Sequence, residues 1–304
     1  MITLRRLTKR YGEKTVVDEL TFDVTSGQVT GFLGPNGAGK STTMRMTLGL
    51  DAPNAGEVRI GGKHYAELQH PLREVGALLE AKALHPGRSA GKHLLAMARS
   101  NGLPASRVEE VLATVGLSDV AGKRAGQFSL GMGQRLGIAG ALLGDPGVLL
   151  FDEPVNGLDP DGVRWVRQLM RSLAAEGRTV FVSSHLMSEM QLTADHLVVI
   201  GRGRLLADAP VGEFIAGNSR TTVSVRVPVA GERQKLDQRL RSDGADTHAG
   251  EPDELVVDGL AVARVGDLAH ELGIRLHGLS EQRASLEQAY MELTAASVEY
   301  GVSA

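Results

Sequence analysis

Short apolar runs alternate with helical segments through most of the chain. Residues 28–33 and 148–151 are strand-like runs, and the second is typical of a strand buried on both faces of a parallel sheet. Helices are expected over residues 40–50 and 161–175, and residues 179–183 predict a further strand. This alternation of strands and helices predicts an α/β fold.

A helical insert interrupts the alternation at about residues 86–145, and we call it the helical arm. Helical patterns cover residues 89–100 and 106–115. A Ser-x-x-Glu capping box at residues 106–109 is expected to open the second of these helices. Residues 136–143 continue the pattern as a third helix.

The composition changes at residues 216–219, which sets the expected boundary between a first domain, residues 1–217, and a second, residues 218–304. The order of strands and helices in the second domain predicts a small α+β fold of the ferredoxin-like type. Its strands are expected at residues 221–229, 254–257 and 274–279, and its helices at 232–242, 263–272 and 284–293. The last helix carries an apolar stripe of Leu286, Ala289, Tyr290 and Leu293.

Residues 34–41 read Gly-Pro-Asn-Gly-Ala-Gly-Lys-Ser, which is the pattern of a phosphate-binding loop between a strand and a helix. The glycines let backbone N–H groups converge on an anion, and the following helix adds the positive end of its dipole. Lys40 is expected to reach the β- and γ-phosphates, and the Ser41 hydroxyl to coordinate Mg²⁺. The residues expected to bind the nucleotide here are Gly34, Pro35, Asn36, Gly37, Ala38, Gly39, Lys40, Ser41 and Thr42.

Asp152 and Glu153 follow the apolar run 148–151, at the end of a predicted parallel strand. Asp152 is suited to hold Mg²⁺, directly or through water, and Glu153 to polarise the water that attacks the γ-phosphate. Acidic pairs after strands are also common in turns. Taken alone, this pair therefore leaves a solvated strand end as the alternative.

Three more motifs stand in a fixed order with these two. Residues 128–135 read Phe-Ser-Leu-Gly-Met-Gly-Gln-Arg, residues 156–159 Asn-Gly-Leu-Asp and residues 183–185 Ser-Ser-His. The order resembles that of the ATP-binding subunit of ABC transporters over about residues 1–217. The resemblance implies a P-loop NTPase cassette with a RecA-like core, an antiparallel β subdomain and a helical subdomain, and it implies ATP and Mg²⁺ as ligands.

In that family two cassettes close head to tail around two ATP molecules, so the resemblance implies a homodimer with composite sites. Ser129 and the backbone N–H of Gly131 would contact the γ-phosphate bound by the partner. His185 would hold the γ-phosphate and the attacking water, and Asp159 would connect the two sites. Tyr11 occupies the place of an aromatic ring that stacks on adenine.

Two positions depart from the common pattern of the family. Glu80 stands where glutamine is usual, and its carboxylate can offer an oxygen to Mg²⁺ but adds repulsion near the γ-phosphate. Residues 128–132 replace Leu-Ser-Gly-Gly-Gln but keep Ser129 and Gly131. Both departures resemble the sequences of drug-efflux cassettes for bacitracin and daunorubicin. This resemblance implies an ATPase that drives drug or antibiotic export.

Composition is consistent with a membrane-associated cytoplasmic subunit. The 304 residues, 42% of them hydrophobic, can form one large core and a second small one. A net charge of −3 without a dense basic stripe argues against nucleic acid as a main partner, and the lack of cysteine excludes disulfides. No run approaches the roughly 18 apolar residues of a membrane span, and the amino terminus lacks a signal peptide's apolar core. We expect a soluble protein at the cytoplasmic face of the membrane, bound to a separate permease subunit.

The main alternative is a soluble ABC protein that acts on ribosomes or DNA. Such relatives typically carry two cassettes or long coiled-coil insertions, and this chain has one cassette and neither insertion. A P-loop kinase or GTPase would leave the segment around Ser129 and His185 unexplained. The motifs do not identify the transported molecule or prove its direction, because the substrate path lies in the membrane subunit.

Overall fold

The computed structural model describes residues 1–80, 84–218, 221–282 and 284–295. The chain forms two compact units, Met1–Val211 and Gly212–Ala304. The expected domain boundary at residues 217 and 218 lies at the end of helix α8 (Val211–Asn218) and stays a prediction.

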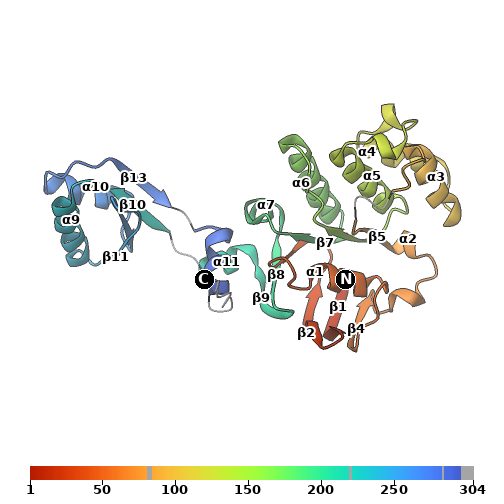
Figure 1. The fold of residues 1–304 in the computed structure, drawn as a ribbon, viewed down its shortest axis with the longest axis horizontal. Helices are drawn as coiled ribbons and strands as arrows, with labels where there is room; N and C mark the ends of the chain where they lie inside the picture. Colours follow the sequence, from red (N-terminus) through yellow and green to blue (C-terminus); the bar gives the residue numbers. More distant parts are fainter. Residues whose placement is uncertain (81–83, 219–220, 283, 296–304) are drawn as a thin grey trace. The chain divides into compact units, whose positions relative to one another are not determined.

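A six-stranded sheet forms the centre of the first unit (Figure 1), with the order β5-β6-β7-β3-β8-β9. Every neighbouring pair is parallel except β8 and β9, which pair antiparallel. Apolar runs such as Val-Leu-Leu-Phe in β6 form these strands because both faces of the sheet are covered. The strands are β3 (Val29–Leu33), β5 (Val75–Leu78), β6 (Val148–Asp152), β7 (Thr179–Ser184), β8 (His196–Gly201) and β9 (Arg204–Pro210).

A three-stranded antiparallel sheet packs against one face of the six-stranded sheet and confirms the expected β subdomain. Its order is β2-β1-β4, from β1 (Ile2–Tyr11), β2 (Lys14–Val24) and β4 (Ala55–Ile60). Phe22 of β2 lies 5.6 Å from Phe32 of β3 and 6.0 Å from Phe181 of β7, measured between ring centroids. All three rings are buried, so they join the two sheets in one apolar core.

Helices complete the layers of the first unit. Helix α1 (Lys40–Thr47) follows the phosphate loop and contacts β2, β4 and β6. Helices α6 (Pro160–Ala175) and α7 (Met187–Thr193) contact each other and β3. Short helical turns also occur at Tyr65–Glu67, Pro71–Glu74 (α2), Ser118–Val120 and Ala125–Gln127.

The helical arm contains α3 (Ala90–Ser100), α4 (Ser106–Thr114) and α5 (Leu130–Leu142), which gather beside β5 (Figure 1). Ser89 caps α3 by accepting a hydrogen bond from Lys92 N at 3.4 Å. The capping box expected at residues 106–109 is wrong, because Ser106 is already helical and the N-cap is Ala105, which makes no side-chain cap. Three helices were expected in the arm, and its described residues contain three α-helices besides the two short turns.

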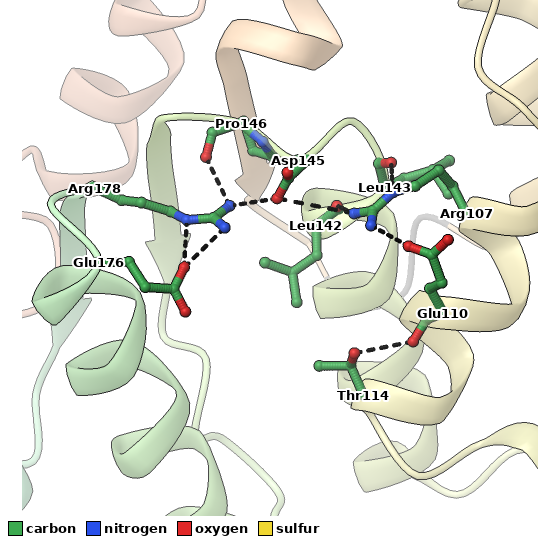
Figure 2. Close-up of polar contacts among 9 residues, drawn as sticks. All are labelled: Arg107, Glu110, Thr114, Leu142, Leu143, Asp145, Pro146, Glu176 and Arg178. Carbon is green, nitrogen blue, oxygen red and sulfur yellow. Dashed lines mark hydrogen bonds and ion pairs between the residues drawn. The ribbon is translucent and has the colours of Figure 1, made fainter.

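Charged side chains fix the carboxyl end of α5 (Figure 2). The Arg107 guanidinium donates to the carbonyls of Leu142 at 3.1 Å and Leu143 at 3.3 Å, which satisfies two acceptors at the helix end. Asp145, in the turn that follows, accepts from Arg178 at 2.8 Å and lies 3.9 Å from Arg107. Arg178 lies directly before β7, so these contacts connect the end of α5 to the central sheet.

The second unit has the ferredoxin-like order of elements. Its antiparallel sheet runs β11-β12-β10-β13, and its elements follow one another as strand, helix, two strands, helix and strand. The bounds are β10 (Thr222–Arg226), α9 (Ala230–Ser242), β11 (Asp246–Ala249), β12 (Glu254–Asp258), α10 (Val262–Glu271) and β13 (Gly278–Gln282). Strand β11 was not predicted, and the last strand lies at 278–282 instead of 274–279.

Helix α11 (Leu286–Ala295) closes the described part of the second unit. Leu286 and Ala289 are fully buried, whereas Tyr290 and Leu293 are half-buried. The predicted apolar stripe therefore faces protein along its first turn. None of the helices in the described ranges combines the length and the hydropathy needed to cross a bilayer.

The contact of β5 with α5 leaves no space for an added methyl group at Gly76. An ideal Cβ at Gly76 would overlap the carbonyl oxygen of Ala141 and lie 2.9 Å from Pro146 Cγ. We expect Gly76→Ala to lower the free energy of unfolding in urea by ~1–3 kcal/mol, the usual cost of overpacking. Gly147→Ala is the matched control, since a Cβ there meets nothing within 4 Å. Equal stability of the two variants would contradict the close packing of β5 on α5.

Candidate nucleotide site

The phosphate loop lies between β3 and α1 and has the backbone geometry that its glycines predict. Gly37 has φ 81° and Gly39 has φ 106°, both in the left-handed region that favours glycine. A Cβ at Gly39 would lie 2.7 Å from the carbonyl oxygen of Val16. The loop therefore needs glycine for its turn and for its close approach to β2.

The Lys40 side chain turns into the loop. Its ammonium donates to the carbonyl oxygens of Gly34 at 2.7 Å and Pro35 at 3.4 Å, and only 7% of the residue is exposed. Burial lowers the pKa of Lys40, while the negative charges of Glu153 and Asp152 act in the opposite direction. A cation is thus fixed at the centre of the loop, close to two carboxylates.

A hollow forms where the phosphate loop meets the end of β6. Glu153 lines it together with Val16 of β2, so the structure brings the catalytic glutamate expected from sequence to the phosphate loop. The other lining residues are Asn36, Gly37, Gly39, Lys40, Ser41 and Thr42. An anion held by the loop would face the Glu153 carboxylate across this hollow.

The acidic pair at the end of β6 is held by β7. The Ser183 hydroxyl donates to Asp152 Oδ1 and accepts from the backbone N–H of Glu153 at 3.0 Å. Glu153 has φ 50°, a left-handed conformation that is uncommon for a residue with a side chain. One hydroxyl of β7 therefore fixes both members of the pair.

His185 follows β7 and meets Glu153. Its Nδ1 lies 2.8 Å from Glu153 Oε2, and about half of the His185 side chain is exposed. Ser184, the preceding residue, accepts from the backbone N–H of Leu186 at 3.0 Å and shapes the turn. The two residues expected to be catalytic, Glu153 and His185, are thus in direct contact.

Ser129 and Gly131 lie at the start of α5, outside the residues that line the hollow in the described part of the chain. The Ser129 hydroxyl accepts from Met132 N at 3.2 Å and caps the helix. A Cβ at Gly131 would lie 3.2 Å from Leu158 Cδ2, and one at Gly157 would overlap the Leu130 side chain. The two glycine positions therefore permit close packing between the segment around Ser129 and residues 156–159.

Asp159 has a local structural partner. Its Oδ1 accepts from Gly162 N at 2.8 Å and caps α6.

Among the other expected residues, Glu80 is exposed just beyond β5. Residues 81–83, which follow Glu80, lie outside the described ranges.

Tyr11 lies beside the helix that follows the phosphate loop. Its hydroxyl donates to Asp51 Oδ2 at 3.1 Å, and the same carboxylate oxygen accepts from Arg45 of α1 at 2.7 Å. The Lys9 ammonium lies 5.0 Å from the ring centroid, and 49% of Tyr11 is exposed. The ring thus has a fixed hydroxyl end and an accessible surface.

Comparison with known proteins places this geometry in a family. One family model, described as ABC transporter, matches residues 17–156, and another, described as a domain of unknown function (DUF8746), matches residues 221–287. The bacitracin transport ATP-binding protein BcrA of Bacillus licheniformis is 44% identical over 207 residues, which are 67% of this chain and 68% of that protein. The uncharacterized ABC transporter ATP-binding protein YhcH of Bacillus subtilis is 36% identical over 300 residues, 97% of this chain and 96% of that protein. The chain belongs to the ATP-binding proteins of ABC transporters.

A solved structure agrees with this membership. The dimeric structure of a post-hydrolysis state of an ATP-binding cassette, bound to ADP and Pi, superposes with a TM-score of 0.63 at 25% identity. The match covers 69% of this chain and 99% of that one. This ABC protein is an ATPase, and the kinase and GTPase alternatives are wrong.

Two contacts in the ABC ATPase were missed from sequence. Ser183 holds both carboxylate residues, and Gln134 Nε2 donates to the carbonyl oxygen of Glu153 at 3.1 Å. Gln134 is 3% exposed, so its amide is a buried polar group in the mainly apolar helix α5. That unusual polarity was the available signal, but it does not identify the partner.

The Ser183 contacts generate a prediction about turnover. We expect Ser183→Ala to lower kcat for ATP hydrolysis ~10-fold, because Asp152 and the Glu153 backbone both lose their fixed partner. Ser184→Ala is the control: its hydroxyl accepts from Leu186 N and has no contact with the acidic pair in the described ranges, so we expect kcat within ~2-fold of wild type. Steady-state ATPase assays measure both variants. Equal kcat for wild type and Ser183→Ala would show that this hydroxyl does not support the acidic pair.

Proposed function

We propose that this ABC ATPase drives the export of an antibiotic or a related compound through a separate membrane permease. The observation that carries the proposal is the contact of Glu153 with His185 at 2.8 Å beside the hollow of the phosphate loop. The substrate class follows from the 44% identical relative, which is named for bacitracin transport. A transport role is therefore favoured over action on ribosomes or DNA.

In this proposal, residues 34–42 bind the phosphates of ATP. Residues of the loop and of the first turn of α1 line the hollow, so their backbone N–H groups would meet the phosphates, and Lys40 supplies a fixed positive charge. Tyr11 offers its exposed ring to adenine. The Lys9 ammonium lies over the ring, so adenine takes the remaining face or displaces that side chain.

The residues that would hold Mg²⁺ are Ser41, Asp152 and Glu80. All three offer hard oxygen donors, which suit Mg²⁺. No cluster of three or more histidine, aspartate or glutamate side chains forms a metal site in the described ranges, so phosphate oxygens and water would complete the coordination. When bound, Mg²⁺ would neutralise charge on the β- and γ-phosphates and offset the negative charge of Glu80.

Glu153 orients and polarises the attacking water in this proposal. Its Oε2 bonds His185 Nδ1, which leaves His185 Nε2 to meet the γ-phosphate. The buried Lys40 ammonium lines the same hollow and would stabilise the phosphate charge. Residues of one hollow would thus stabilise the phosphate charge and orient the attacking water.

Two copies of the chain complete each site head to tail. Ser129 and the backbone N–H of Gly131 contact the γ-phosphate held by the partner, because the amino end of α5 carries the positive end of its dipole. Asp159 uses one oxygen to cap α6, so we assign the contact with the partner site to the other. Residues 218–304 form an accessory domain, and the dimer works at the cytoplasmic face of the membrane.

Replacement of Glu153 tests the assignment of the water-orienting group. Glu153→Gln keeps the size of the side chain but removes its negative charge, so we expect ATP turnover to fall at least ~100-fold while ATP binding is retained. A dimer stabilised by ATP should accumulate in size-exclusion chromatography. Turnover within a factor of about two of wild type would show that another group orients the water.

The transport part of the proposal has its own test. We expect cells that carry Glu153→Gln in place of the wild-type chain to become as sensitive to bacitracin as cells that lack it, because export needs ATP hydrolysis. Growth inhibition by bacitracin measures this, with the wild-type chain as the control. Unchanged sensitivity in the deletion strain would refute bacitracin-like export and leave the ATPase assignment intact.

A further inference from the structure

The backbone of Glu153 has an uncommon conformation, and hydrogen bonds hold both its N–H and its carbonyl group. Its φ of 50° lies in the left-handed region, where a residue with a side chain carries strain. Its N–H donates to the carbonyl oxygen of Ser183 at 3.2 Å and to the Ser183 hydroxyl at 3.0 Å. Its carbonyl oxygen accepts from Gln134 Nε2 at 3.1 Å. The direction of the Glu153 side chain therefore depends on groups from both β7 and α5.

Burying the Gln134 amide costs free energy, which its hydrogen bond to Glu153 offsets. Only 3% of this residue is exposed, and a buried amide must be hydrogen-bonded to offset its loss of water. Gln134 lies just over one turn along α5 from its N-cap, Ser129. The same short stretch of helix thus carries the expected phosphate contact and the contact to Glu153.

The opposite end of α5 is tied independently. Figure 2 shows the Arg107 guanidinium on the last carbonyls of α5 and the pairing of Asp145 with Arg178 in the following turn. These contacts hold the helical arm to the sheet without involving Gln134. The polar contact of Gln134 with Glu153 is therefore not the only tie that holds α5 in place.

We propose that Gln134 is a positioning residue that aims the Glu153 carboxylate by holding the Glu153 peptide. The inference rests on the proposed role of Glu153 and extends it to the helical arm. The helix that begins after Ser129, and that would contact the partner's nucleotide, is thus the helix that holds the Glu153 peptide.

A purely structural role for Gln134 would have different consequences. If Gln134 only held the arm in place, its loss would disturb the first turn of α5 and with it the contact to the partner's nucleotide. If it aims Glu153, its loss would leave ATP binding and dimer closure intact and slow hydrolysis. ATP affinity, dimer formation and kcat therefore separate the two roles.

The test uses Gln134→Met, which keeps a long unbranched side chain and removes the donor. We expect kcat for ATP hydrolysis to fall ~10-fold or more, with the Kd for ATP changed by less than ~2-fold. Arg73→Met is a control for the loss of a side-chain bond at an exposed position, because it removes a 2.9 Å bond to the carbonyl oxygen of Gly102 and does not touch Glu153. We expect Arg73→Met to keep kcat within ~2-fold of wild type.

The double variant Gln134→Met, Glu153→Gln completes the experiment. It should form the ATP-stabilised dimer as well as Glu153→Gln does, measured by size-exclusion chromatography with ATP. Loss of that dimer, an equal fall in kcat for Arg73→Met, or kcat of Gln134→Met within ~2-fold of wild type would each overturn the positioning role. Normal turnover of the single variant Glu153→Gln would instead refute the proposed function, so the two failures are distinguishable.

Discussion

The parallel pairing of β3, β6 and β7 is the interaction on which the candidate site depends. Leu33 pairs with Ser184, and Asp152 pairs with Ser183, so the three strands end at one edge of the sheet. Ligand sites of open α/β sheets form at the carboxyl ends of their strands. The phosphate loop, the acidic pair and His185 leave the sheet together for this reason. If β6 shifted by one residue along its neighbouring strands, the side chains of Asp152 and the residues beside it would point to the opposite face of the sheet.

Hydrogen bonds from neighbouring elements add the accuracy that strand pairing does not supply. The left-handed backbone of Glu153 costs on the order of 1–3 kcal/mol, and contacts from β7 and α5 offset that strain. Close packing at Gly131 and Gly157 holds the start of α5 against residues 156–159. The site is therefore assembled from the sheet and the helical arm together, although the phosphate loop alone has the local geometry for an anion.

Much of the fold followed from local sequence patterns. The strands around the phosphate loop and the acidic pair were predictable, because apolar runs and glycine spacing act over a few residues. The contacts of Gln134 and Ser183 were not, because they depend on which elements lie beside β6. Strand β11, with the sequence Asp-Thr-His-Ala, lacks an apolar alternation and exists through its pairing with β12. The capping box at residues 106–109 failed because the helix begins at Ser106 itself.

The inward turn of Lys40 changes the thermodynamics of nucleotide capture. Its ammonium already bonds the Gly34 carbonyl, so phosphate binding exchanges one acceptor for another instead of ordering a free side chain. A lysine loses up to ~2 kcal/mol of rotamer entropy when it is immobilised. Here that loss belongs to the folding of the loop. Binding of polyphosphate consequently carries a smaller entropic penalty. The fold is less stable by the same amount, because it orders Lys40 before the ligand binds.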